Sequence, residues 1–182
     1  LHVFDGPTPR EAAERATATF GRPRMPPRVA FAPWNDAIFG SENVRAVAKR
    51  LRDNKVPTSV IWTEDWKGAE WNGESYGLAE RWSVDETLYP DFPKLADDLH
   101  ALGFHFQVYF DPFVFTDSDA WQETSSKGWL VKRQDGSPYV FTGGKVSDTG
   151  LIDLDNPDAR AWVVKKMREA MAMGVDGWMN DF

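Results

Sequence analysis

Carboxylate side chains recur near the ends of apolar segments at four places along the chain, and at three of them a tryptophan lies close by. The four clusters are Trp34-Asn35-Asp36, Trp62-Thr63-Glu64-Asp65-Trp66, Asp111-Pro112 and Trp178-Met179-Asn180-Asp181. Carboxylates accept hydrogen bonds from ring hydroxyls, and an indole face stacks on the apolar C–H face of a pyranose. One carboxylate can attack an anomeric carbon while another protonates the leaving oxygen. An aspartate after a strand is commonly a turn or cap residue, but the recurrence at four places favours a shared carbohydrate site.

A ring of carboxylates could instead hold a metal ion. Histidine is the commonest ligand of transition metals, yet the three histidines are poorly placed for that role. His2 is in the N-terminal tail, His100 is in the middle of a predicted helix, and His105 is at the start of a predicted strand. A magnesium site made of carboxylates alone stays open. We expect no bound metal and no other cofactor.

Apolar periodicity and capping residues predict the elements that must position these clusters. Strands and helices alternate, with a long tryptophan-rich loop after the second strand. The predicted strands cover 28–33, 59–62, 104–110 and a segment that begins at 175–179. The predicted helices begin at Ser41, Asp91, about Asp117 and Asn156, and a hairpin over 129–139 turns at Asp135-Gly136. Such alternation implies parallel strands joined by right-handed crossovers, which bring the four clusters to one rim.

The fold class that this order predicts is α/β, as the first half of a (β/α)₈ TIM barrel. A whole barrel needs roughly 250 residues, whereas residues 28–182 provide four βα units, so we expect a truncated barrel. A doubly wound open sheet is the rival. Against it, no glycine-rich phosphate loop follows the first strand, where the sequence reads Phe31-Ala32-Pro33-Trp34-Asn35-Asp36.

Residues 1–27 are expected to be a linker and helix that trail an N-terminal β-domain. Gly6-Pro7-Thr8-Pro9 is typical of a turn, and Thr8 or a following residue can cap a helix to Thr19. The proline-rich stretch from Gly21 to Pro27 is typical of a stiff linker. We therefore place a domain boundary between residues 27 and 28.

Composition excludes several classes of protein. The chain has 182 residues with 28 acidic and 21 basic side chains, and its net charge of −7 argues against a nucleic-acid or membrane partner. It has no cysteine, which excludes disulfides and thiol catalysis, and its 9 tryptophans are an excess that could line a binding surface. No apolar run approaches a membrane span. With no export signal visible, we expect a cytoplasmic location, and the open edges of a half-barrel predict self-association.

Several motifs, in this order and spacing, resemble family 31 of the glycoside hydrolases, the α-glucosidase family. They cover nearly the whole chain. They are Gly6-Pro7-Thr8-Pro9-Arg10-Glu11, Gly21-Arg22-Pro23, Met25-Pro26-Pro27-Arg28, Ile61-Trp62-Thr63-Glu64-Asp65-Trp66, Tyr89-Pro90-Asp91-Phe92, Leu102-Gly103-Phe104, Asp111-Pro112, Asp155-Asn156-Pro157-Asp158-Ala159-Arg160 and Asp176-Gly177-Trp178-Met179-Asn180-Asp181-Phe182.

The resemblance implies roles for individual residues. Asp181 matches the nucleophile of a retaining, double-displacement mechanism. Asp65, with Glu64 as the second choice, and Asp111 match the residues that contact the sugar in the −1 subsite. From the rim clusters we add four candidate substrate-binding residues, which are Trp66, Trp178, Trp34 and Asp36. Trp34, Trp62 and Trp178, at strand ends, could point into the barrel or toward the helices, because alternate side chains of a strand point to opposite faces.

The sequence around Asp181 resembles a branch of the family that reads Trp-Met-x-Asp-Phe and includes the sulfoquinovosidases. Those enzymes bind a sulfonate with an arginine and a tryptophan three residues later, whereas Arg81 and Trp82 are adjacent here. Sulfoquinovosidase-like specificity is therefore an alternative to the hydrolysis of other terminal α-glycosides. The family's general acid is expected beyond Phe182, so we expect the isolated chain to be inactive. A non-catalytic carbohydrate-binding or structural piece is the other alternative.

Overall fold

The computed structural model describes residues 1–71, 76–143 and 146–181 of the chain. Within them the chain divides into two compact units, Leu1–Phe31 and Ala32–Phe182. The expected glycine-rich loop at Gly143-Gly144 lies partly outside the described residues. The assignment of residues 1–27 to the end of another domain stays a prediction.

The first unit contains one α-helix and a short 3₁₀ turn. Helix α1 (Pro9–Phe20) begins at Thr8, whose side-chain oxygen accepts a hydrogen bond from the Glu11 amide. The strand expected over 28–33 is a wrong prediction, because Arg28–Phe31 forms a 3₁₀ helix. The Ala30 amide donates to the carbonyl of Pro27 at 3.0 Å, so the backbone after the prolines turns and does not extend.

The second unit is built on a parallel four-stranded sheet in the order β1-β2-β5-β9. Its strands are β1 (Trp34–Asp36), β2 (Val60–Thr63), β5 (His105–Phe110) and β9 (Gly177–Asn180). Each strand neighbours the next one of the four along the chain, as in a (β/α)₈ barrel. The α/β class and the partial barrel expected from the sequence are confirmed.

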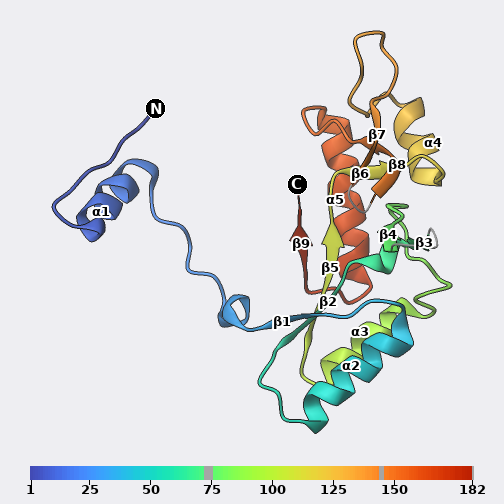
Figure 1. The fold of residues 1–182 in the computed structure, drawn as a ribbon, viewed down its shortest axis with the longest axis horizontal. Helices are drawn as coiled ribbons and strands as arrows, with labels where there is room; N and C mark the ends of the chain where they lie inside the picture. Colours follow the sequence, from blue (N-terminus) through green and yellow to red (C-terminus); the bar gives the residue numbers. More distant parts are fainter. Residues whose placement is uncertain (72–75, 144–145, 182) are drawn as a thin grey trace. The chain divides into compact units, whose positions relative to one another are not determined.

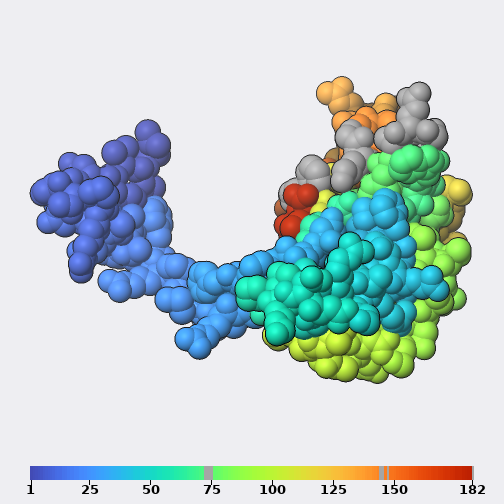
Figure 2. Space-filling view, turned by 60° about the horizontal axis from the view of Figure 1, so that its bottom comes forward, coloured from blue at the N-terminus to red at the C-terminus, as the bar shows by residue number. Residues whose placement is uncertain are grey.

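In the described part of the second unit, four α-helices accompany the sheet. They are α2 (Ser41–Asp53), α3 (Phe92–Ala101), α4 (Asp119–Ser126) and α5 (Pro157–Ala172). Helices α2 and α3 lie side by side, in cyan and yellow-green (Figures 1 and 2). Helix α2 begins at Ser41, and the residue that caps it is Gly40, whose φ of 91° suits glycine. Among the described residues, no helix has both the length and the apolarity that crossing a membrane requires.

The core lies between the sheet and these helices. Alternate residues of β5 point into it, and Phe106, Val108 and Phe110 are almost completely buried. The same core includes Val44 of α2, Leu95 and Leu99 of α3, and Trp162 of α5. Asn156 caps α5 by accepting hydrogen bonds from the amides of Asp158 and Ala159, as the sequence predicts.

The loops after β2 and β5 form small sheets of their own. After β2 come the 3₁₀ helix η2 (Asp65–Lys67) and the antiparallel strands β3 (Ala69–Trp71) and β4 (Tyr76–Leu78). After β5, strands β6 (Phe113–Phe115), β7 (Val140–Gly143) and β8 (Val146–Leu151) pair in the order β6-β8-β7. The hairpin expected over 129–139 is present, with Lys132 bridged to Pro138 and Gly136 at a φ of 85°.

Candidate active site

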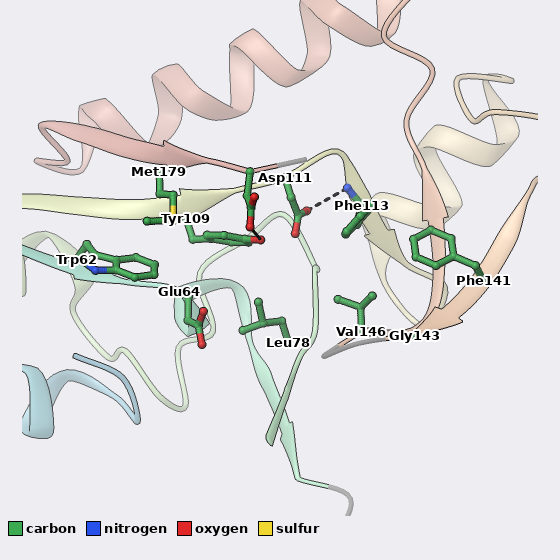
Figure 3. Close-up of a pocket in the computed structure, with 11 residues that line it drawn as sticks. Trp62, Glu64, Leu78, Tyr109, Asp111, Phe113, Phe141, Gly143, Val146 and Met179 are labelled. Carbon is green, nitrogen blue, oxygen red and sulfur yellow. Dashed lines mark hydrogen bonds between the residues drawn. The ribbon is translucent and has the colours of Figure 1, made fainter. Parts of the chain in front are cut away.

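A cavity of about 620 Å³ lies at the carboxyl ends of the parallel strands. Side chains from the barrel strands and from both loop sheets line it (Figure 3). Those with polar groups are Trp62, Glu64, Tyr109, Asp111 and Asp181, and the others are Leu78, Phe113, Phe141, Gly143, Val146 and Met179. A pocket of this size suits a small molecule, and its mixture of aromatic rings and carboxylates suits a sugar.

Strand register explains which side chains reach the cavity. Successive side chains of a strand point to opposite faces, and residues paired across parallel strands share a face. Tyr109 of β5 pairs with Met179 of β9, and both line the cavity. Val108 and Trp178, one residue earlier on each strand, form the neighbouring pair and face the helices. The contact between the rings of Trp178 and Phe110, with centroids 5.8 Å apart, agrees with this placement.

Asp181 follows β9 and is the most accessible of the cavity's carboxylates. Its backbone amide donates to the carbonyl of Phe110 at 3.0 Å, which fixes the chain at the end of the sheet. Its Oδ2 accepts a hydrogen bond of 3.0 Å from the Tyr109 hydroxyl. Burial, with the charges of Asp111 and Asp181, raises the pKa of Tyr109. Tyr109 therefore remains protonated at neutral pH, and its hydroxyl orients Asp181 by donating to Oδ2.

Asp111 is almost fully buried, at 4% exposure, directly after β5. Its Oδ1 accepts a hydrogen bond of 3.0 Å from the Phe113 amide. Among the described residues, no donor lies within hydrogen-bonding geometry of its buried Oδ2. Burial raises the pKa of Asp111, and the charge of Lys67 and the nearby Tyr109 hydroxyl oppose that effect. A buried carboxylate oxygen without a donor is a natural acceptor for a ligand hydroxyl.

Of the two neighbouring acids after β2, the cavity is lined by Glu64 and not by the preferred candidate Asp65. Asp65 is completely buried. Its Oδ2 accepts from the Phe39 amide at 2.8 Å, and its Oδ1 accepts from the hydroxyls of Thr63 and Tyr89. These bonds tie the segment after β1 to the end of β2, so Asp65 has a structural position. Strand alternation, which puts Trp62 and Glu64 on one face, would have identified Glu64 as the acid that lines the cavity.

The remaining rim candidates also lie outside the set that lines the cavity. Trp66 is buried in the core, where its Nε1 donates to the Tyr109 carbonyl at 2.9 Å and its ring packs on Phe92. Trp34 is 37% exposed on β1, in register with Val60. Asp36 pairs with Trp62 in the sheet and is exposed. The structure therefore brings together Asp181, Asp111 and Glu64 from the expected set, and separates Asp65, Trp66, Trp178, Trp34 and Asp36 from them.

A buried ion pair beside the cavity was not predicted from the sequence. Lys67 at the end of η2 and Glu80 after β4 bond to each other, and each side chain is only 1% exposed. Burial raises the pKa of Glu80, the charge of Lys67 opposes this, and the charge of Asp111 adds to it. The spacing of residues 67 and 80 does not predict this pair, because the antiparallel pairing of β3 and β4 that brings them together was not predicted.

The apolar wall of the cavity was also missed. Leu78 comes from β4, Phe113 from β6, Phe141 from β7 and Val146 from β8. The rings of Phe113 and Phe141 lie edge to face with centroids 5.1 Å apart. Within the part of the chain that the structure describes, no group of three or more His, Asp or Glu side chains is placed to hold a metal ion.

Comparison with known proteins places this geometry in a family. Residues 23–182 match the model of the "Glycosyl hydrolases family 31 TIM-barrel domain". The chain is 28% identical over 171 residues to a sulfoquinovosidase of Escherichia coli K12, covering 93% of this chain and 25% of that protein. It is 27% identical over 187 residues to the alpha-xylosidase XylQ of Lactiplantibacillus pentosus, covering 100% of this chain and 23% of that protein.

A comparison with a solved structure agrees with this family match. The family 31 sulfoquinovosidase from E. rectale, in complex with the aza-sugar inhibitor IFGSQ, superposes with a TM-score of 0.81 at 30% identity, covering 94% of this chain and 26% of that one. The chain thus spans about a quarter of the length of these relatives. The family match covers most of the sequence, including the four parallel strands and the carboxylates that follow them. The chain belongs to family 31 of the glycoside hydrolases, and its second unit is part of that family's TIM-barrel domain.

Proposed function

We propose that this chain carries the nucleophile and part of the sugar-binding site of a retaining α-glycosidase that hydrolyses terminal α-glycosidic bonds. The observation that supports this most is the convergence of Asp181, Asp111 and Glu64 on one cavity at the carboxyl ends of the strands. In that mechanism, an Asp181 oxygen forms a bond to the anomeric carbon while the bond to the leaving oxygen breaks. Water then cleaves the glycosyl–enzyme ester and releases the sugar with its original configuration.

The other groups of the cavity take binding roles in this proposal. Asp111 and Glu64 accept hydrogen bonds from sugar hydroxyls, and Trp62 offers an aromatic face to the ring. Tyr109 holds Asp181 in place through its hydroxyl. The resemblance assigns the general acid to a segment beyond Phe182, so activity is expected of the natural protein that contains this sequence and not of the 182 residues alone. A cytoplasmic location and self-association stay predictions.

The substitution Asp181→Ala in the natural protein tests the proposed nucleophile. Turnover of an aryl α-glycoside should fall on the order of 10³-fold or more, because no covalent intermediate can form. Added azide should restore turnover and give a β-glycosyl azide, since azide then attacks once from the face that Asp181 occupied. Asp97→Asn, on the exposed surface of α3, is the matched control and should be unchanged. Retained activity in Asp181→Ala would contradict the assignment.

Substrate choice needs its own experiment. Glucosides, xylosides, galactosides and sulfoquinovosides should be compared by kcat/KM, because the named relatives include both sulfoquinovosidases and an α-xylosidase. Arg81, the candidate sulfonate ligand, donates to the Asp117 carbonyl at 3.1 Å and pairs with Glu70, and it does not line the cavity. Trp82 is buried in the core. We therefore expect neutral α-glycosides to be preferred over sulfoquinovosides, and the opposite ranking would favour the sulfoquinovosidase alternative.

A further inference from the structure

The buried Lys67–Glu80 pair has no role in the reaction proposed above, although it lies beside the site. Its two side chains come from η2 and from the segment after β4, and they are 1% exposed. Removing a lysine and a glutamate from water costs several kcal/mol for each ion, which the pairing alone does not reliably recover. A buried pair of this kind therefore needs a reason beyond stability.

The surroundings of the pair connect it to Asp111. The Lys67 ammonium lies 4.8 Å from the Trp82 ring centroid and 5.3 Å from that of Phe110, the residue before Asp111. The Glu80 carbonyl accepts a hydrogen bond of 3.0 Å from the Phe115 amide, which joins Glu80 to the strand that follows Asp111. The lysine thus lies against the residue before Asp111, and the Glu80 backbone is bonded to the strand that follows Asp111.

Carboxyl groups outnumber positive charges among the groups that act on Asp111 and Glu80. The groups that act on the pKa of Asp111 are Lys67 of η2, Asp181 after β9 and the Tyr109 hydroxyl of β5, and the charge of Asp111 acts in turn on Glu80. Glu64, which also lines the cavity, acts on Glu80. Burial raises the pKa of both Asp111 and Glu80, and Lys67 lowers the pKa of both. The pKa of Glu80 rises to about 7, so below neutral pH Glu80 holds a proton and the lysine charge is left to act on Asp111.

We propose that Lys67, held in place by Glu80, is a positioning residue that supplies the positive charge needed for Asp111 to remain an anionic acceptor for a sugar hydroxyl. Lys67 does not touch the substrate in this arrangement, and it acts through Asp111. The inference rests on the proposed glycosidase function and adds to it the electrostatic support of the sugar-binding carboxylate.

Three variants of the natural protein separate this role from a structural one. Lys67→Met removes the charge and keeps the length of the side chain. Lys67→Met combined with Glu80→Gln leaves a neutral pair of similar shape, and Glu80→Gln alone keeps the lysine charge. The pH profile of kcat/KM for an aryl α-glycoside should have its acidic limb about 1 unit higher in both variants that lack Lys67. Glu80→Gln alone should leave that limb in place.

The double variant decides between the two roles. Replacing a buried ion pair by a neutral pair of similar volume is often tolerated in stability, so its thermal midpoint should recover relative to Lys67→Met. If the acidic limb also returns to the wild-type position in the folded double variant, Lys67 has a structural role and the proposal is overturned. A limb that stays shifted while stability recovers supports the proposal.

A titration of Asp111 itself keeps this test independent of turnover. Carboxyl ¹³C resonances of aspartate-labelled natural protein should be followed with pH, with Asp111→Asn used to assign the signal. The Asp111 midpoint should rise by about 1 pH unit in the double variant, and an unchanged midpoint would overturn the proposal even in an inactive protein. By contrast, the wild-type protein could cleave no α-glycoside while the Asp111 midpoint still rises as expected in the double variant. That result would count against the proposed function alone.

Discussion

Tyr109 and Tyr89 are two buried tyrosines whose hydroxyls both donate to an aspartate, in different surroundings. Tyr109 donates to Asp181 at the cavity, whereas Tyr89 donates to Asp65 beneath it. Tyr109→Phe should lower kcat/KM about 10- to 100-fold, since it removes a hydrogen bond to a charged group that we propose as the nucleophile. Steady-state kinetics of the natural protein with an aryl α-glycoside measure this.

Tyr89→Phe is the matched control, because it removes the same atom at the other aspartate. It should cost about 1–3 kcal/mol of stability, since it takes a donor from a fully buried carboxylate, and should change kcat/KM less than threefold. If both variants lost activity in proportion to their lost stability, Tyr109 would have no special connection to Asp181.

For single residues, the sequence predicted which types of side chain line the cavity better than it predicted which individual residues do so. Asp181, Asp111 and Glu64 lie in the cavity because each follows a strand end with the inward parity. Asp65 and Trp178 are each one residue away from a side chain that lines the cavity. A shift of one residue along a strand turns a side chain to the opposite face of the sheet. Their exact parity depends on where each strand begins pairing, which a single sequence leaves uncertain by a residue.

Among the elements, α5 offers a direct test of capping. Asn156 accepts hydrogen bonds from two amides at the start of this helix, and Ala159 and Trp162 in its first turns are buried. Asn156→Ala should destabilise the protein by about 0.5–2 kcal/mol, because two amide groups lose their acceptor. Thermal unfolding of the natural protein measures the loss. Asn156→Asp keeps the acceptor and should lie close to wild type; equal losses in both variants would show that capping is not the cause.

Elements with local signals were predictable from the sequence, and those made by distant pairing were not. Helices α1 and α5 have a polar cap followed by proline, which marks their first turn. Strands β6 and β8 pair Phe113 with Leu151, far apart in the sequence. The three-residue length of β6 carries no periodic pattern. The apolar wall of the cavity was missed for this reason. Three of the four barrel strands were expected close to where they lie, whereas the first was expected over 28–33 and lies at Trp34–Asp36.

The whole second unit concentrates negative charge at one end of its sheet. Crossover topology alone predicts that Glu64, Asp111 and Asp181 converge, because parallel strands end at the same rim. It does not predict that Lys67 and Glu80 would be buried there, since that depends on how the β3–β4 hairpin folds over the rim. The stability of the molecule should therefore respond to pH in a way that its composition does not reveal.

The direction of that response follows from Glu80. Its pKa rises from an ordinary 4.5 to about 7 in the folded protein, chiefly through burial. Between these values the native state holds a proton that the unfolded state has released, so stability falls as pH rises from about 4.5 to 7. The raised pKa of Asp111 acts in the same direction. The lowered pKa values of Asp98 and Glu123 act oppositely, and their stabilisation is lost only as the pH falls below about 4.

Glu80→Gln should therefore flatten the dependence of the thermal midpoint on pH between 4.5 and 7, because the amide cannot release a proton. One pKa unit corresponds to about 1.4 kcal/mol, so the effect over this range is a few kcal/mol at most. Asp98→Asn, at a surface carboxylate bound by Arg45 and Lys94, should change the curve only at acidic pH. A Glu80→Gln curve parallel to wild type from pH 4.5 to 7 would mean that Glu80 is ionised throughout, paired with Lys67 as a permanent salt bridge.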